Sequence, residues 1–209
     1  MLLTLPVIAT FFTSAILLAY APGPDIVFVM AQSAVHGPKA GLSTMLGLVT
    51  GLCFHTIIVA VGVAALILAS PLAFTLLKVA GAAYLVYLAW LSWRAAAMQT
   101  SEEKPHFPGC WALYRRGIIM NITNPKVSIF FLAFLPQFCD PARGSVAAQC
   151  VLLGLLFMLA ALIAFTSVSL LAGRVFSRFN STARGQVILN RACAVIFVSL
   201  AVLLLTTHV

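Results

Sequence analysis

The chain has 209 residues, of which 63% are hydrophobic and only 8% are charged, and its mean hydropathy is +1.11. Soluble domains usually carry about 25% charged residues, so this composition excludes an ordinary soluble enzyme and indicates an integral membrane protein. The formal net charge is +8, but Lys and Arg fall between the apolar runs, where they determine topology, so we expect no nucleic-acid partner.

Six apolar segments follow one another along the chain, each near the ~20 residues that span a bilayer. We therefore expect an all-α membrane protein with six transmembrane helices in a single domain over residues 1–209. The segments cover approximately residues 5–34, 42–69, 72–96, 117–138, 146–173 and 187–206.

The first segment is interrupted by Ala21-Pro22-Gly23-Pro24-Asp25. Pro22 and Pro24 have no backbone N–H, so a continuous helix would leave the carbonyls of Leu18 and Tyr20 without donors. Lipid-exposed irregular backbone is not tolerated inside a membrane. The break is therefore expected to line a polar cavity. If the broken half were re-entrant, only five segments would span; we favour six.

Asp25 is an ionisable group at or near membrane depth, which by default indicates a functional site. Two interpretations are open and compatible. Asp25 could cap the half-helix that begins after the break, where a carboxylate suits the helix dipole. It could also bind a substrate ammonium group, a proton, or both.

The second segment carries Gly47, Gly51 and His55 on one helical face. The Gly47-x-x-x-Gly51 spacing favours close helix packing in membranes. His55 lies one turn further along, either as a packed histidine bonded to a neighbouring helix or as a proton carrier, since histidine titrates near physiological pH.

The fourth segment contains a second break, Asn121-Ile122-Thr123-Asn124-Pro125-Lys126. Pro125 frees the Asn121 carbonyl, and Asn124, which precedes a proline, is pushed away from helical geometry. Lys126 then opens a half-helix, where a cation is electrostatically disfavoured. We expect Lys126 to pair with Asp25 or to meet an anionic substrate group, rather than to snorkel to the interface.

An internal repeat relates the two breaks, because Pro24-Asp25 in repeat one (about 1–98) matches Pro125-Lys126 in repeat two (about 113–209). Each half has an odd number of spans, so the halves must be inverted. Inverted repeats with helices broken at equivalent positions, here 1 and 4, are typical of secondary transporters, whose binding site lies at the repeat interface.

Basic residues concentrate in the connections after segments one, three and five, so the positive-inside rule predicts cytoplasmic basic loops and both termini outside. These residues are Lys39, Arg94, Lys104, Arg115, Arg116, Arg174, Arg178 and Arg184. The five cysteines show no C-x-x-C pair and no metal-ligand spacing, so we expect small packing residues and no metal or cofactor.

These motifs together resemble the LysE/RhtB family of bacterial amino-acid exporters over essentially the whole chain. The resemblance rests on Pro22-Gly23-Pro24-Asp25, the Gly47–His55 stripe, residues 77–85, Asn121 to Lys126, and residues 134–138. It implies a multi-pass permease of the bacterial inner membrane, not an enzyme. Such a permease exports threonine, homoserine, homoserine lactone or related amino acids, driven by the proton gradient.

Segment six departs from the family pattern, because Ala194 and Ala201 stand where members often have glycines. The replacement of glycine by alanine at these positions affects how helices pack and which substrate shape fits. Homodimerisation stays open, since small-residue stripes serve internal packing equally well.

The sequence suggests a charge clamp for a zwitterionic amino acid between the two breaks. Asp25 and freed carbonyls near Leu18 and Tyr20 would take the ammonium group. Lys126, Asn124 and half-helix amides would take the carboxylate, and Asp25 or His55 would couple transport to protons. An ion or metal permease is the main alternative, while an intramembrane redox protein or a non-transporting scaffold explains the symmetric breaks less well.

Overall fold

The computed structural model describes residues 2–63, 71–95, 106–171 and 183–206, and within these ranges the chain is helical with no strand. The predicted loop residues Lys104, Arg174 and Arg178 lie outside these ranges. The main helices are α1 (Leu5–Tyr20), α2 (Pro24–His36), α3 (Pro38–Ile58), α5 (Pro71–Arg94), α6 (Cys110–Ile122), α7 (Pro125–Ile129), α8 (Val146–Leu171) and α10 (Ala183–Thr206).

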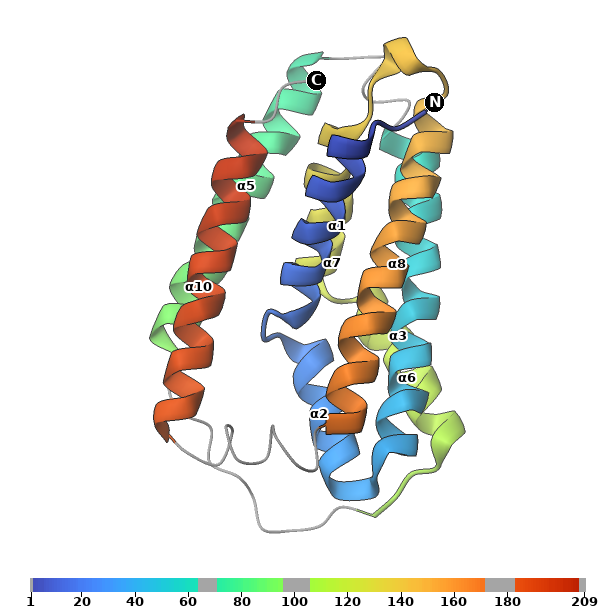
Figure 1. The fold of residues 1–209 in the computed structure, drawn as a ribbon, viewed down its shortest axis with the longest axis vertical. Helices are drawn as coiled ribbons and strands as arrows, with labels where there is room; N and C mark the ends of the chain where they lie inside the picture. Colours follow the sequence, from blue (N-terminus) through green and yellow to red (C-terminus); the bar gives the residue numbers. More distant parts are fainter. Residues whose placement is uncertain (1, 64–70, 96–105, 172–182, 207–209) are drawn as a thin grey trace.

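Two bent helix pairs account for the broken segments predicted from sequence. α1 and α2 meet at 56°, and α6 meets the Pro125–Phe138 segment at 48°. By length and composition the described residues hold four unbroken spans, or six if each bent pair counts as one. Figure 1 shows each bent pair running from one end of the bundle to the other, with both termini at the same end. The six-span prediction is therefore confirmed, and the re-entrant alternative is not supported.

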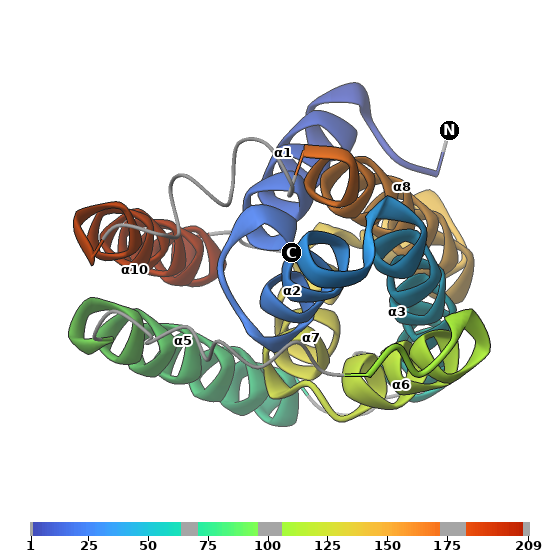
Figure 2. The same cartoon turned by 90° about the horizontal axis from the view of Figure 1, so that it is seen from below.

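Corresponding helices of the two halves run in opposite directions in Figure 1: α1–α2 against α6–α7, α3 against α8, and α5 against α10. Viewed along the bundle, α5 and α10 form a pair on one side, and α1, α2 and α7 lie between this pair and α3, while α6 lies beside α3 (Figure 2). α3 packs on α6, and α1 packs on α8. α2, α5 and α8 all run toward the end opposite the termini, so the connections that follow them are on that side of the molecule.

α6 begins at Cys110, earlier than the start near residue 117 that apolar content indicated. Gly109, with φ of +87°, turns the chain into this helix, a backbone angle that glycine adopts at low cost. The first turns carry Arg115 and Arg116, which are exposed. An apolar-run criterion misses this part because its polar side chains face outward.

Phenylalanine rings fill the core on one side of the breaks. After α7 the chain continues as a π-helix, Phe130–Phe134, and a 3₁₀ turn, Leu135–Phe138. Phe130 stacks on Phe134 with ring centroids 4.6 Å apart and meets Phe157 of α8 at 5.0 Å. These contacts fix the second broken helix against α8, since packing rather than exclusion of water holds membrane helices together.

Glycines bring the backbones of α3 and α6 into contact. A Cβ atom on Gly47 would collide with the Tyr114 carbonyl, and one on Gly117 would collide with the Thr44 carbonyl. The predicted packing role of Gly47 is thus confirmed, and its partner surface is α6. Three cysteines, Cys139, Cys150 and Cys193, are buried as free thiols.

Gly47→Ala is expected to lower stability by about 1–3 kcal/mol, the usual effect of overpacking a tight contact. Gly62→Ala is the matched control, because a Cβ atom there meets nothing within 4 Å. Thermal unfolding of the detergent-purified variants measures both. Equal melting temperatures for the two variants would contradict close α3–α6 packing.

Candidate functional site

The first break separates α1 from α2 with only three residues between them. α1 ends at Tyr20, and Ala21 leaves the helix with φ of −62° and ψ of 126°. Pro24 occupies the first turn of α2, where its missing N–H costs no helical hydrogen bond. Gly23, not Asp25, is the N-cap residue. The capping interpretation of Asp25 is therefore wrong, although its carboxylate still lies in the first turn, where the helix dipole favours it.

The second break is closed by a side-chain cap. Asn124 is the N-cap of α7, and its Oδ1 accepts a hydrogen bond from the backbone N of Lys126 at 3.0 Å. Its backbone is extended, with φ of −76° and ψ of 108°, as a residue before proline requires. Asn124 and Lys126 are both buried.

Lys126 joins the two breaks. Its Nζ donates hydrogen bonds to the backbone carbonyl oxygens of Leu18 at 3.3 Å and Ala21 at 3.0 Å. A cation is stabilised at the C-terminal end of a helix, and α1 ends at these residues. A Cβ atom on Gly23 would lie 2.9 Å from this Nζ, so the glycine leaves room for the ammonium group.

Asp25 is held by Asn121 instead of by a direct ion pair. Its Oδ2 accepts a hydrogen bond from Asn121 Nδ2 at 3.3 Å, and the residue is 2% exposed. Within the described ranges no ion pair joins Asp25 to Lys126, because the ammonium group is committed to carbonyl oxygens. The two charges still interact electrostatically across the site.

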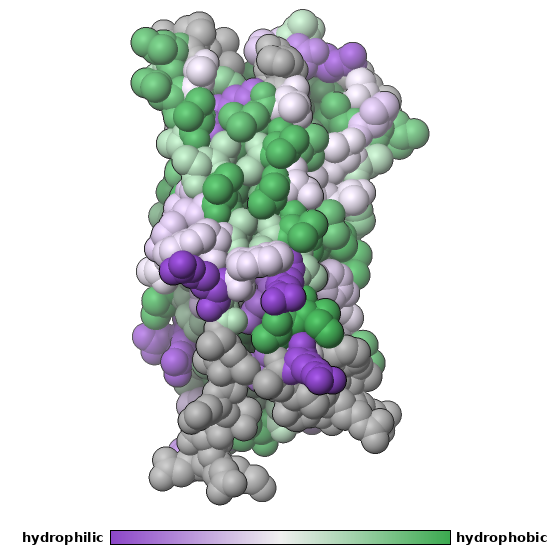
Figure 3. Space-filling model, turned by 90° about the vertical axis from the view of Figure 1, so that its left-hand side faces the viewer, coloured by the Kyte–Doolittle hydropathy of each residue, from purple (hydrophilic) through white to green (hydrophobic). Residues whose placement is uncertain are grey.

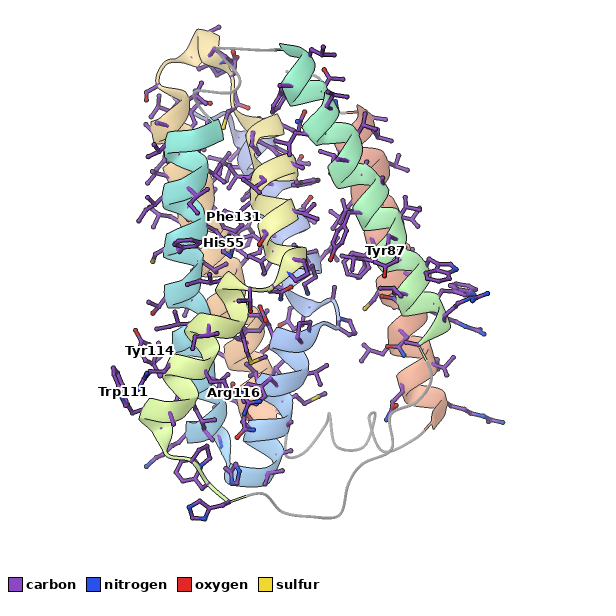
Figure 4. All side chains as sticks on the ribbon, turned by 180° about the vertical axis from the view of Figure 1, so that it is seen from behind. His55, Tyr87, Trp111, Tyr114, Arg116 and Phe131 are labelled. Atoms are coloured by element: carbon purple, nitrogen blue, oxygen red, sulfur yellow. The ribbon has the colours of Figure 1, made fainter. Side chains whose placement is uncertain are left out.

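Asn121 connects the carboxylate to His55. His55 Nε2 lies 3.1 Å from the Asn121 carbonyl oxygen. Pro125 cannot donate to this oxygen, which also accepts a hydrogen bond from the Asn124 backbone N at 3.1 Å. Because a carbonyl only accepts, Nε2 must carry the hydrogen. The ring packs against Phe54 and Phe131, with centroids 5.7 and 5.5 Å away, and Figure 4 shows His55 and Phe131 together in the middle of the bundle. His55 is thus a packed histidine bonded to a neighbouring helix.

Three polar atoms at this site are buried without a close, well-aligned hydrogen-bond partner: Asp25 Oδ1, Asn121 Oδ1 and Asn124 Nδ2. The Asn124 side chain still interacts with the Asp25 carboxylate. Buried polar groups are nearly always paired, so each such atom requires an explanation. The two acceptor oxygens suit the ammonium group of a zwitterionic ligand. The donor nitrogen and the Lys126 ammonium group suit its carboxylate.

The central cavity is small. Asp25, Asn121 and Lys126 line it together with apolar residues such as Phe157, and its volume is ≈ 10 Å³. That is about the space of one water molecule. A ligand the size of an amino acid enters only if the broken helices separate from α3 and α8.

All the residues singled out from sequence converge here. Pro22, Gly23, Pro24 and Pro125 shape the breaks. His55, Asn121 and Asp25 form one hydrogen-bonded chain, Asn124 and Lys126 form another, and a hydrogen bond from the Asn124 backbone N to the Asn121 carbonyl oxygen joins the two. Sequence reasoning missed a further contact: Tyr20 Oη lies 2.7 Å from Ser167 Oγ. The only signal for it is the group of hydroxyl residues Thr166, Ser167 and Ser169 in the mainly apolar fifth segment.

Two discontinuous helices that meet at the centre of a multi-pass bundle define a membrane protein of the transporter type. The chain matches the LysE type translocator family over residues 16–208, and it belongs to this family. No solved structure matches it.

Two relatives illustrate the similarity. The chain is 34% identical over 188 residues to the homoserine/homoserine lactone efflux protein of Salmonella typhimurium, covering 90% of each chain. It is 39% identical over 130 residues to an uncharacterized membrane protein of Vibrio cholerae, covering 62% of this chain and 63% of that relative.

Lys126→Met is expected to destabilise the protein by about 1–3 kcal/mol, because the Ala21 carbonyl loses its donor and because the charge that compensates Asp25 is removed. The Leu18 carbonyl keeps a hydrogen bond from the Ala21 backbone N. Lys39→Met is the control: Lys39 is exposed, and such changes usually stay within about 0.5 kcal/mol. Thermal unfolding in detergent distinguishes them. An unchanged or raised melting temperature for Lys126→Met would show that the carbonyl contacts contribute no stability.

Proposed function

We propose that this protein exports amino acids or close derivatives, of the threonine, homoserine or lysine type, from the cytoplasm by proton-coupled secondary transport. The observation that carries the proposal is the group of unpartnered polar atoms between the two helix breaks. The similarity to the homoserine/homoserine lactone efflux protein of Salmonella typhimurium supports the substrate class. We further propose an inner-membrane location with the basic end cytoplasmic and the termini outside, following the positive-inside rule.

The substrate ammonium group would bind Asp25 Oδ1 and Asn121 Oδ1, which are both acceptors without donors in the structure. The substrate carboxylate would bind Asn124 Nδ2 and Lys126, with the Lys126 ammonium group leaving one of its two carbonyl partners. Each end of the zwitterion then meets a complementary partner, so neither charge is buried bare.

Binding requires the two broken helices to move, because the cavity is too small for an amino acid. The π-helix Phe130–Phe134 follows α7 directly, and π-bulges are frequent at functional sites. We propose that α2 and α7 shift at their proline breaks, opening the site first toward one end of the bundle and then toward the other.

Coupling of substrate export to proton entry would follow because the proton and the substrate compete for the Asp25 carboxylate. Asp25 can bind a proton or the substrate ammonium group, but not both at the same oxygen atoms. Proton entry from outside would therefore displace the substrate outward. His55 would act indirectly in this scheme, by holding the Asn121 carbonyl in place.

Asp25→Asn and Lys126→Gln are each expected to reduce efflux of preloaded homoserine or threonine by about tenfold or more, as loss of a buried charged partner usually does. Asp140→Asn is the matched control. Asp140 pairs with Arg143 at 3.2 Å with both side chains nearly half exposed, in the turn beside Leu2 and Leu3 and away from the residues of the two breaks. Normal efflux by both site variants at normal expression would exclude the charge clamp.

The coupling proposal is tested in proteoliposomes with an imposed pH gradient. The wild-type protein should move substrate faster with the gradient, whereas residual transport by Asp25→Asn should not respond to it. His55→Gln should be slower yet still respond. If His55→Gln loses the response while Asp25→Asn keeps it, His55 carries the proton instead.

A further inference from the structure

The outer face of the α5–α10 pair carries an apolar groove of ≈ 400 Å³. The groove lies between the two helices, and aliphatic and indole side chains make up nearly all of its wall. Its lining comes from Val86, Ala89, Trp90 and Trp93 of α5, and from Ala194, Val195, Val198 and Ser199 of α10. Figure 3 looks at this side of the molecule, with hydrophobic side chains above and a group of hydrophilic ones below.

Arginines flank the groove at the end nearer the basic connections. The Arg94 guanidinium lies 4.9 Å from the Trp90 ring centre, and that of Arg191 lies 5.2 Å from the Trp93 ring centre. Arg184 and Arg191 line a second hollow of ≈ 380 Å³ just beyond. Among the described residues, none of these guanidinium groups pairs with a carboxylate.

We propose that this groove binds one anionic phospholipid, independently of what the protein transports. The acyl chain fills the apolar groove, and the phosphate contacts Arg94 and Arg191. Basic pockets between transmembrane helices recognise anionic headgroups in this way. The tryptophans suit the site, because indole rings favour the level of the headgroups and each one orients an arginine by a cation–π contact.

A second copy of the chain fits this face less well. In a two-fold dimer the same patch lies on both subunits, so the arginines of one copy would face those of the other at the same depth. An anionic lipid supplies the opposite charge that a second copy lacks.

The bound lipid would bridge two helices that contact the rest of the bundle mainly through the π-helix Phe130–Phe134. At present α5 and α10 are joined at this level by a hydrogen bond from Asn190 Nδ2 to the Ala95 carbonyl, 3.2 Å long. The lipid would add a second link beside it.

Native mass spectrometry of the purified full chain tests the site, with phosphatidylglycerol and phosphatidylcholine of identical acyl chains offered in separate samples. The wild-type protein should retain roughly 10- to 30-fold more phosphatidylglycerol than phosphatidylcholine, which is the effect expected of two arginines near a headgroup. Arg94→Gln/Arg191→Gln should bring the ratio near one. Lys39→Gln/Arg115→Gln removes the same charge from exposed positions near the starts of α3 and α6 and should keep the preference.

Val198→Trp fills the groove without changing charge, and it should reduce retention of both lipids while the protein stays monodisperse and unfolds at its usual temperature. Equal retention of the two lipids by the wild-type protein would overturn the proposal. The proposal would also be overturned if the Lys39→Gln/Arg115→Gln control lost the preference as fully as Arg94→Gln/Arg191→Gln. A lipid-free dimer that Val198→Trp dissociates would overturn it too, because the groove would then bind a second copy of the chain.

Discussion

The structure depends on the ammonium group of Lys126 and the two backbone carbonyls that it reaches. A membrane interior offers no water to pair with backbone groups, so a helix can break there only where other protein groups replace the lost partners. Pro22 and Pro24 break the first helix, and a lysine from the second break satisfies its carbonyls. The second break therefore supplies a donor that makes the first one tolerable, while the second is closed by its own Asn124 cap and by His55.

Asn121 plays the complementary part on the acidic side of the site. Its side chain reaches Asp25 and its carbonyl is held by His55. A Cβ atom on Gly51 would come within 2.7 Å of Asn121 Cβ, so the glycine stripe of α3 sets the position of Asn121. Helix packing and ligand geometry are linked through this one residue, since any change in the α3–α6 distance moves the group that holds the carboxylate.

The sequence predicted both breaks, their pairing and the six spans, because proline and charge in apolar runs are strong local signals. It did not predict how the charges are satisfied. The choice of Lys126 between Asp25 and the carbonyls of α1 depends on distances between segments a hundred residues apart. The predicted start of α6 was too late because exposed arginines interrupt the apolar run in its first turns. The groove beside Trp90 and Trp93 was not predicted because it forms only where α5 and α10 pack together.

The bond between Lys126 and α1 has a consequence for how the family can vary. Its acceptors are main-chain oxygens, so the identities of the side chains at Leu18 and Ala21 do not enter the interaction. Relatives are free to exchange these two residues for others of suitable size while the lysine keeps its anchor. Correlated substitutions among relatives would then fail to reveal this contact. Only the prolines that leave the carbonyls without helical donors would indicate it.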